Sequence, residues 1–439
     1  MFTKKFFKGG VAVPHHKNTA DCETIKMDVP KKVIIPMNQH IGAPCEALVK
    51  KGDAVKVGQV IGQSDKFVSA PIHSSVSGTV KNIAHILHPG GFLVESVEIE
   101  PDGRQEVHED VKPPQFSNYK EFIECIRQSG LVGLGGAGFP THVKLSPPEG
   151  KTVDTLIVNG AECEPYITSD YREMVENPSH IMSGINILIE QLGVKKVWIG
   201  IEDNKPEAIR ILSDMAANDG RVNVVKLKSR YPQGAEKMLI YAITGRKVPP
   251  GKLPMDVGVI VMNVNSVSFV SEYLKTGMPL IKKRITVDGS AVKKPVNIEA
   301  LIGTPLEDVF EFCGGFKSEP YKVLMGGPMM GLAQYSLQTS VLKHTNALLA
   351  FDRKDSEPVT ESACIRCGRC VEACPMDLLP LYINLNVIKE NMDELQKYHV
   401  NDCIECGSCS YVCPSKRHLV QSVRLAKAQM KKLAVKGGK

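Results

Sequence analysis

Residues 364–375 read CIRCGRCVEACP, and residues 403–414 read CIECGSCSYVCP. Both stretches follow C-x2-C-x2-C-x3-C-P, the spacing of bacterial two-cluster ferredoxins. Three cysteines spaced in this way wrap a loop around one face of an iron–sulfur cube, while the fourth begins the next helix and ligates the other cube. The repeat therefore predicts two [4Fe–4S] clusters with crossed ligands: Cys364, Cys367, Cys370 and Cys413 for cluster 1, and Cys403, Cys406, Cys409 and Cys374 for cluster 2.

Two zinc sites are the alternative interpretation of these cysteines. Structural zinc usually takes two separated pairs of ligands, and neither run has that arrangement. The segment between the runs, DLLPLYINLNVIKENMDELQKY (residues 377–398), has a helical pattern. We therefore expect an α-helical dicluster domain over residues 355–420 that relays single electrons and needs a donor and an acceptor.

The composition is that of a globular protein with metal or redox chemistry. The chain has 439 residues, 54 Lys and Arg against 48 Asp and Glu, 43% apolar and 23% charged residues. This balance excludes a disordered or fibrous chain. No apolar run is long enough to span a bilayer, and no signal peptide follows the basic N-terminus, so we expect a chain that stays in the cytoplasm. Thirteen cysteines in such a chain indicate metal or redox sites more than disulfides.

The rest of the chain divides by its pattern of apolar residues. Residues 30–100 alternate Val, Ile and Thr with polar residues and turns, which predicts a small all-β sandwich or barrel. From about residue 120 to 270, buried strands such as TVDTLIVNG alternate with helical stretches such as HIMSGINILIEQLG, which predicts an α/β domain. A small α+β unit then extends to about residue 350.

A glycine-rich loop, GLVGLGGAGFPTHVKL, occupies residues 130–145. Gly133, Gly135 and Gly138 match the dinucleotide fingerprint G-x-G-x-x-G. That fingerprint requires a preceding strand and a long helix after the loop, whereas here a helical pattern precedes it and Phe139-Pro140 interrupts the segment after it. A Rossmann site and a plain structural turn are therefore both weaker interpretations than a phosphate-binding loop of another kind.

Two further segments end buried strands in polar residues. TLIVNGAECEP (residues 155–165) ends in Asn159, Glu162 and Glu164, and VIVMNVNSVSF (residues 259–269) carries Asn263, Asn265 and Ser266. The carboxyl ends of strands are where α/β proteins place their ligands. Together with Lys144, which could offset phosphate charge, these segments predict one nucleotide site.

These motifs resemble known families. GLGGAGFPT, TLIVNGAECEP and VMNVNSV resemble the flavin- and NADH-binding 51 kDa subunit of respiratory complex I. FFKGGVAVPHHKN (residues 6–18) and RITVDGSAVKKPVNIEALIGTP with LMGGPMMG (residues 284–331) resemble the RnfC component of the Rnf electron transport complex, an ion-translocating ferredoxin:NAD oxidoreductase. The resemblance covers nearly the whole chain.

The resemblance implies a multidomain α/β and β architecture. It places a barrel-sandwich hybrid at 1–110, a 51 kDa-like FMN/NADH domain at 115–270, an SLBB β-grasp at 271–350, the dicluster domain at 355–420 and a basic tail at 421–439. Residues matched to FMN contacts are Gly135, Gly136, Lys144, Asn159, Glu162, Asn263 and Ser266. Residues matched to NADH contacts are Gly136, Ala137, Phe139, Lys144, Glu162 and Glu164, and Gly138 and Asn265 complete the candidate site. Leu134 stands where complex I has an arginine, and Asn265 where it has a glutamate.

The implied function is reversible hydride exchange between NAD(H) and FMN, with single electrons relayed through both clusters to partners in the cell membrane. The implied partners are the other subunits of an Rnf-type complex and, indirectly, ferredoxin, with coupling to Na+ or H+ translocation at the cytoplasmic face. No side chain is expected to act as an acid or base. The alternatives are a cobalamin reductase of bacterial microcompartments, whose members start close to the glycine loop, and a non-catalytic adaptor. Lys66 resembles a lipoylation site but is expected to be a turn lysine, and His15 and His16 are expected to be loop residues.

The positive charge is concentrated at the C-terminus. The net charge of the chain is +6, but residues 414–439 carry eight Lys or Arg and no acid, which leaves −2 for the remainder. This distribution argues against a nucleic-acid binder. Apolar residues recur at helical spacing between these charges: Leu419, Val423, Ala426, Met430 and Leu433. The tail therefore predicts a basic amphipathic helix that either docks on a membrane or partner, or packs on its own dicluster domain.

Overall fold

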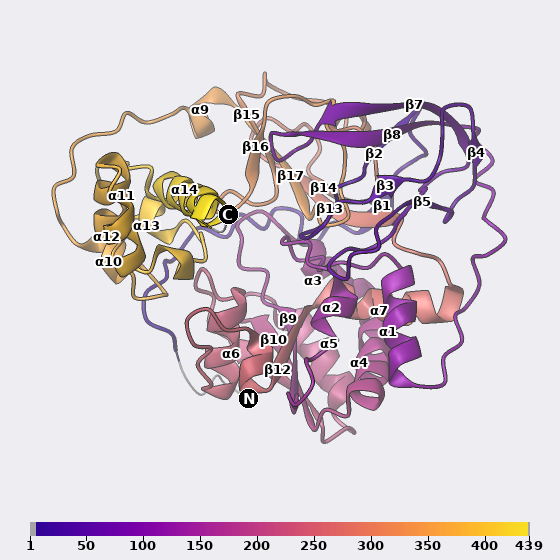
Figure 1. Cartoon of the computed structure of the whole chain (residues 1–439), viewed down its shortest axis with the longest axis horizontal. Coiled ribbons are helices and arrows are strands. Elements are labelled where there is room, and N and C mark those ends of the chain that lie inside the picture. The colour runs from indigo at the N-terminus through magenta and orange to yellow at the C-terminus, as the bar shows by residue number, and fades with distance from the viewer. Residues whose placement is uncertain (1–5, 438–439) are drawn as a thin grey trace.

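The computed structural model describes residues 6–437, and side chains up to residue 432. The described chain forms four sheets and a helical C-terminal unit. Figure 1 shows the β-rich parts on one side of the molecule, the α/β part below them and the cysteine-rich helices at the edge. The expected multidomain architecture of β, α/β and helical units is thus present.

The sandwich domain (residues 30–110) is built from two small antiparallel sheets. One has the order β2-β8-β7-β4 and the other β3-β5-β6. Its strands are β2 Val33–Pro36, β3 Glu46–Ala47, β4 Ala54–Val55, β5 Val60–Gln63, β6 Ile72–His73, β7 Gly78–Leu87 and β8 Leu93–Pro101. Alternate side chains of these strands, such as Val33, Ile35, Val97 and Ile99, fill one core, as the alternating sequence pattern predicts.

The α/β domain (residues 115–277) has a four-stranded parallel sheet of order β11-β10-β9-β12. Its strands are β9 Thr155–Gly160, β10 Lys196–Glu202, β11 Val222–Leu227 and β12 Val259–Asn263. Its helices are α1 Tyr119–Gln128, α2 Thr141–Lys144, α3 Ser169–Glu176, α4 Pro178–Leu192, α5 Pro206–Ala216, α6 Glu236–Thr244 and α7 Val264–Thr276. Helices α4, α5 and α7 cover one face of the sheet and α6 covers the other, so the strand ends and the glycine loop meet at one edge.

The β-grasp domain (residues 278–352) contains a six-stranded mixed sheet of order β1-β14-β13-β17-β15-β16. Its own elements are β13 Lys282–Asp288, β14 Val296–Leu301, α8 Leu306–Phe312, β15 Lys322–Met325, β16 Leu332–Gln334 and β17 Ala347–Phe351. The edge strand β1, Thr24–Lys26, pairs in parallel with β14. The expectation that all of residues 1–110 belong to the sandwich is therefore wrong for β1, because its hydrogen-bonding partner lies in this sheet.

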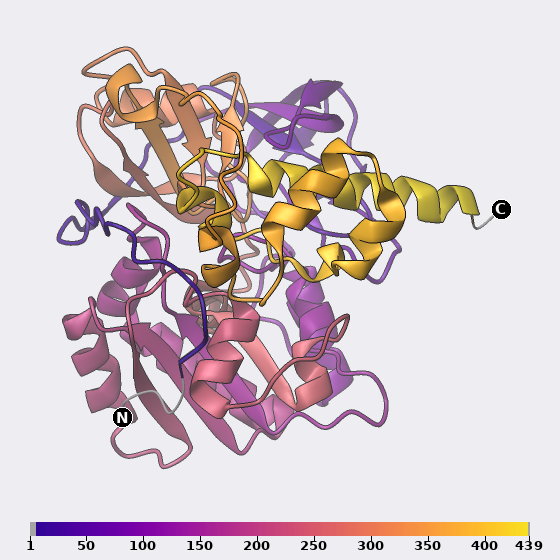
Figure 2. The ribbon, with the colours of Figure 1, turned by 90° about the vertical axis from the view of Figure 1, so that its left-hand side faces the viewer.

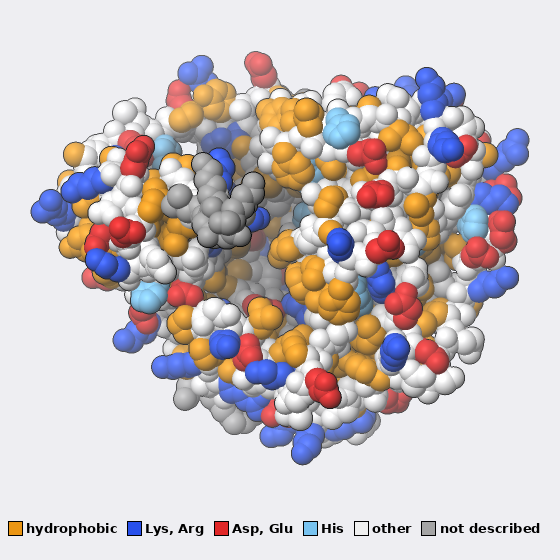
Figure 3. Space-filling view, in the orientation of Figure 1, with side chains coloured by type: hydrophobic (Ala, Val, Ile, Leu, Met, Phe, Trp, Pro, Cys, Tyr) orange, Lys and Arg blue, Asp and Glu red, His pale blue; other side chains and the backbone are white. Residues whose placement is uncertain are grey.

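The cysteine-rich domain (residues 358–437) is helical. Its elements are α10 Arg369–Glu372, α11 Pro380–Ile388, α12 Met392–Lys397, the 3-10 helix Val400–Asp402, α13 Ser408–Tyr411 and α14 Leu419–Gly437. A linker with the short helix α9, Arg353–Ser356, joins it to the β-grasp domain. Figure 2 shows this domain lying across the β-grasp and α/β domains, and Figure 3 shows a hollow between it and the rest of the molecule.

The C-terminal helix α14 packs on its own domain. Val423 and Ala426 are buried in a cluster with Ile383 and Val387 of α11, and Met430 packs against this cluster. Leu419 is buried beside Cys409. The apolar face of the helix, as far as its side chains are described, is therefore occupied, which favours the packing alternative over a helix lying on a membrane. Leu433 lies outside the described side chains.

No helix in residues 6–437 is both long and apolar enough to cross a membrane.

Candidate functional site

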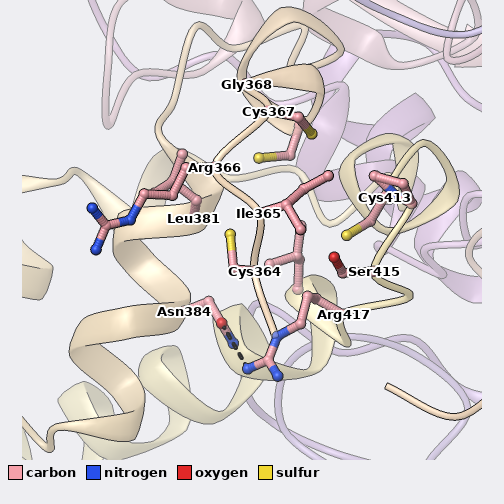
Figure 4. Close-up of a pocket in the computed structure, with 13 residues that line it drawn as sticks. Cys364, Ile365, Arg366, Cys367, Gly368, Leu381, Asn384, Cys413, Ser415 and Arg417 are labelled. Carbon is pink, nitrogen blue, oxygen red and sulfur yellow. Dashed lines mark hydrogen bonds between the residues drawn. The ribbon is translucent and has the colours of Figure 1, made fainter. Parts of the chain in front are cut away.

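The first cavity of the cysteine-rich domain brings together cysteines from both runs. Cys364, Cys367, Cys370 and Cys413 line one space of about 400 Å³, open solvent included. Gly368, with φ +79°, allows the chain to turn from the three-cysteine loop into α10. Figure 4 shows Cys364, Cys367 and Cys413 around the same space. Cys364 and Cys367 are exposed, so this cavity lies at the molecular surface.

The second cavity is its mirror in sequence but is buried. It is lined by Cys374, Cys403, Cys406 and Cys409 and by apolar side chains such as Ile383 and Val420. Backbone amides lie beside two of the sulfur atoms, at 3.4 Å from Leu378 N to Cys374 Sγ and 3.3 Å from Glu405 N to Cys403 Sγ. The structure thus places the fourth cysteine of each run with the three cysteines of the other run, in the crossed arrangement that the spacing predicts.

The buried cavity faces the α/β domain. The Tyr231 hydroxyl donates a hydrogen bond of 2.6 Å to the backbone oxygen of Cys406, and both residues are buried in one apolar cluster. Cys163, which lies between Glu162 and Glu164 in the sequence, packs against the same cluster. The loop after β9 therefore lies between the glycine loop and the second cavity.

The glycine loop is closed at its base and open at its tip. Gly133 N donates to Phe139 O at 2.8 Å, while Gly135, Gly136 and Ala137 are exposed. A Cβ added to Gly136, whose φ is +126°, would have no other heavy atom within 4 Å. At the far side of the loop, Gly138 is buried and its carbonyl accepts from Ile41 N of the sandwich domain at 3.0 Å.

The N-terminus of α7 supports this loop. Ser266 Oγ accepts a 3.0 Å hydrogen bond from Leu134 N, and Ser266 is 2% exposed. Asn263 caps the helix by accepting from Asn265 N at 2.9 Å, and a Cβ on Gly135 would lie only 3.0 Å from Asn263 Nδ2. The exposed glycines therefore stand at the positive end of a 13-residue helix, a position suited to phosphate.

Asp170 is a site residue that the sequence analysis missed. Its carboxylate accepts from Asn263 Nδ2 at 2.8 Å and from Asn265 Nδ2 at 2.6 Å. Burial raises the pKa of Asp170, and Lys283 of β13 opposes this effect. Asp170 sets the orientation of both amides, and the only sequence signal was its position in the first turn of a helix directly after the TLIVNGAECEP segment.

Glu162 also faces the start of α3. Its carboxylate accepts from Asp170 N at 2.6 Å and from Tyr171 N at 3.3 Å, and its φ of +48° turns the chain back toward the helix. Burial raises the pKa of Glu162, and Lys17, with Nζ 4.0 Å from Oε2, opposes this effect. Glu162 therefore lies next to Asp170, close to the residues that support the glycine loop.

Glu164 points elsewhere. Its carboxylate accepts from the backbone amides of Met329 and Met330 at 3.0 and 2.9 Å, in the LMGGPMMG loop of the β-grasp domain. Burial raises its pKa to about 7. The expected NADH contact gains no support from this orientation, since the carboxylate joins two domains.

Asn159 and Lys144 are also engaged in internal contacts. Asn159 Nδ2 donates to Gly234 O at 2.9 Å, and its Oδ1 accepts from Ala161 N at 3.1 Å. Lys144 Nζ donates to Glu236 Oε1 and Val261 O, both at 2.9 Å. The structure thus groups the glycine loop with Asn263, Asn265, Ser266, Glu162 and Asp170, whereas Asn159, Lys144 and Glu164 face other partners.

The residues present fit the cofactors that the sequence implies. Two sets of four thiols line two separate cavities, as two cubic clusters require. The exposed tip of the glycine loop offers open backbone beside a helix N-terminus, as a flavin phosphate requires.

Four known domain families match the chain in sequence order. They are the RnfC barrel sandwich hybrid domain over residues 5–104, the Nuo51 FMN-binding domain over 126–272, the SLBB domain over 284–333 and the 4Fe-4S dicluster domain over 358–426. The last match favours iron–sulfur clusters over the zinc alternative.

Relatives of known name are similar over almost the whole chain. The RnfC component of the proton-translocating ferredoxin:NAD(+) oxidoreductase complex of Clostridium ljungdahlii is 47% identical over 97% of this chain and 94% of its own. The chain belongs to the RnfC family. The corresponding component of the Na(+)-translocating ferredoxin:NAD(+) oxidoreductase complex of Acetobacterium woodii is 46% identical, over 97% of both chains.

Among solved structures, a chain of an NAD+-reducing [NiFe]-hydrogenase is similar to this RnfC family member. It is 19% identical, with a TM-score of 0.50, over 71% of this chain and 63% of that chain. This likeness concerns the fold. The resemblance to RnfC and to the 51 kDa flavin subunit, inferred from the motifs, is confirmed by the relatives and by the matching domains.

Proposed function

We propose that this chain exchanges a hydride with NAD(H) and passes single electrons to the other subunits of an Rnf-type membrane complex. As a member of the RnfC family it is an oxidoreductase subunit with FMN-binding and dicluster domains. Bound FMN supplies the conversion between a two-electron hydride and single electrons, and the bound clusters carry those electrons. The finer steps described below are proposals for this chain.

The observation that carries the proposal is the position of the loop after β9. One end of it, Glu162, lies beside the support of the glycine loop, and Cys163 packs against the apolar cluster that contains Cys406. A site for a two-electron cofactor and a site for a one-electron cofactor are thus joined by two adjacent residues. An adaptor that only docks partners would not require this juxtaposition.

The roles of the side chains are inferred from their contacts. The backbone of Gly135, Gly136, Ala137 and Gly138 would hold FMN, with Ser266, Asn263 and Asn265 keeping the loop and helix end in place. Phe139 is half-buried at the base of the loop, where it can border the nicotinamide side. Glu162 and Asp170 orient neighbouring groups, and no described side chain is required as an acid or base.

The two cavities differ in exposure, which gives them an order. The cavity of Cys374, Cys403, Cys406 and Cys409 is buried against the α/β domain, so it would hold the inner cluster. The cavity that contains the exposed Cys364 and Cys367 would hold the outer cluster, next to a partner protein of the complex. Because each transfer is reversible, the same arrangement serves electron input from NADH and electron output to NAD+.

Purified full-length protein tests the proposal directly. We expect about one non-covalent FMN and about eight irons per chain, and bleaching of flavin and cluster absorbance by NADH. Iron without FMN after reconstitution would refute the enzyme function and leave the adaptor. FMN and iron without bleaching by NADH would refute NAD(H) as the substrate.

The membrane role is proposed from the family. The relatives are named for proton and Na(+) translocation, and we propose that this protein feeds such a complex as a peripheral component at its cytoplasmic face, with ferredoxin as an indirect partner. Co-purification of the chain with membranes that contain the other subunits, and its release when they are absent, would be the expected result. Membrane binding without them would contradict a peripheral attachment through partners.

A further inference from the structure

The motif FFKGGVAVPHHKN (residues 6–18) contains none of the residues to which the proposed function assigns a cofactor. It forms most of the N-terminal arm, defined here as residues 7–22, which has no regular secondary structure. The arm nevertheless contacts the cysteine-rich, α/β and β-grasp domains in turn. Its contacts suggest what these residues do.

The arm first contacts the inner cavity. Gly10 N donates to Ala373 O at 2.9 Å, next to the cavity residue Cys374. Gly9 has a φ of +71°, and a Cβ there would lie 2.6 Å from Cys374 O. Only glycine fits this contact without a shift of backbone, because both the space and the left-handed conformation exclude a side chain.

The next contact secures the same cavity from the α/β side. Val11 and Tyr231 exchange two backbone hydrogen bonds, of 2.7 and 2.9 Å. The Tyr231 hydroxyl in turn donates to Cys406 O. The arm is therefore bonded to residues at or next to two cysteines of the inner cavity, directly at Ala373 and through Tyr231 at Cys406.

Lys17 then anchors the arm to the loop after β9. Its Nζ donates to Glu162 O, Glu164 O and Ile167 O at 2.9, 2.8 and 2.5 Å, and its side chain is 16% exposed. Three carbonyl oxygens that converge inside a protein repel one another, and one ammonium group satisfies all three. The loop also contains two non-glycine residues in the left-handed region, Glu162 and Tyr166, so its shape depends on such support.

Two further contacts complete the connection. His15 O accepts from Tyr166 N at 3.0 Å, and the His16 ring stacks on Tyr166 at 4.8 Å. Beyond them, Asn297 Nδ2 of the β-grasp domain donates to Thr19 O at 2.8 Å. His15 and His16 are thus loop residues, as the sequence analysis expected.

We propose that the N-terminal arm is a positioning element that fixes the inner cluster relative to the flavin loop, and that Lys17 is its positioning residue. This inference rests on the proposed function. Electron transfer between flavin and inner cluster depends on their mutual placement, and the arm is bonded to the supports of both. Removing either anchor should slow that transfer without removing the flavin.

The first test uses Gly9→Ala in the full-length protein loaded with FMN and iron, and Gly52→Ala as a matched control. Gly52 has a φ of +96° but nothing within 4 Å of an added Cβ, so it carries similar backbone strain without a contact. We expect Gly9→Ala to reduce ferricyanide with NADH at the wild-type rate, because the dye takes electrons from the flavin. NADH-driven bleaching of the clusters should slow by about tenfold, with the iron content retained. Gly52→Ala should match wild type in both assays.

Unchanged bleaching in Gly9→Ala would overturn the proposal. Loss of iron from the inner cavity would also overturn it, since the arm would then build the cavity and not position it. The electron paramagnetic resonance spectrum of the reduced inner cluster distinguishes these cases, because displacement alters the signal while iron loss abolishes it.

The second test uses Lys17→Met, which removes the ammonium group and keeps the alkyl chain. We expect hydrogen exchange of the amides in residues 161–168 to become at least about tenfold faster than in wild type. Unchanged exchange would refute the role of Lys17. This measurement needs no turnover, so it tests the arm even if wild-type protein fails to react with NADH, which would refute the proposed function alone.

Discussion

Replacing Ser266 with alanine should weaken FMN binding through the loop and not through a lost contact to FMN. Ser266 Oγ accepts the Leu134 amide at 3.0 Å, and at 2% exposure there is no access for water to replace it. A buried donor left without a partner costs about 1–3 kcal/mol. If binding must restore the loop to its present conformation, that cost is subtracted from the binding free energy. The Kd for FMN should then rise between about fivefold and about 150-fold.

The assay is a titration of flavin-free protein with FMN, monitored by quenching of flavin fluorescence. Ser268→Ala is the matched control, because Ser268 lies two residues later in α7, is equally buried and bonds to Glu173, away from the glycine loop. It should lower stability and leave the Kd near the wild-type value. A Kd for Ser266→Ala within twofold of wild type would show that the loop keeps its shape without this hydrogen bond.

Three other predictions concern the clusters, the domain junction and the tail. Cys374→Ser should disturb the cluster held by Cys403, Cys406 and Cys409 and spare the cluster of its own run; loss of only the outer cluster, seen by paramagnetic resonance, would contradict the crossed arrangement. Burial raises the pKa of Glu164 to about 7 from 4.5, so the folded protein binds this proton more tightly than the unfolded chain does, and the carboxyl destabilises the fold by up to about 3 kcal/mol as pH rises from 4.5 to 7. In urea unfolding between pH 5 and 8, Glu164→Gln should flatten this dependence, and an unaltered slope would be the contrary result. Deleting residues 418–439 should release iron, because Val420 and Val423 line the inner cavity, whereas deleting only 431–439 should retain iron and weaken assembly with the membrane partners; iron retained in the longer deletion would contradict the packing of α14.

The cysteine arrangement could be predicted because its information is local. Each run places three ligands within seven residues, and the fourth lies in the next helix, so spacing alone gives the cavity. The β, α/β and helical regions were likewise evident from periodicity, although β11 was not recognised because polar residues interrupt its apolar pattern.

The contacts of the acidic residues could not be predicted in this way. Glu162 and Glu164 are two residues apart on one loop, yet they face different domains, because the left-handed turn at Glu162 redirects the chain. Asp170 and Lys17 were missed because their importance lies in long-range contacts that no local pattern records. The partner of β1 is equally remote in sequence.

The charged tail illustrates a different limit. Periodicity showed that α14 has an apolar face, but either a membrane or the neighbouring helix could cover it. The structure shows Val423 and Ala426 against α11. Much of the basic face is left to solvent, although Lys427 and Arg424 pair with Glu405.

The parallel pairing of β1 with β14 has a consequence for biosynthesis. Thr19, just before β1, is hydrogen-bonded to a residue 278 positions later, and Gly10 is bonded to Ala373. A ribosome therefore releases the first segment long before its partners exist, and that segment must wait unpaired while three domains emerge. Iron insertion is delayed further, because neither cysteine cage is complete until Cys409 and Cys413 have been made. Maturation of this protein should accordingly be post-translational, with chaperones and cluster-delivery proteins acting on a finished chain.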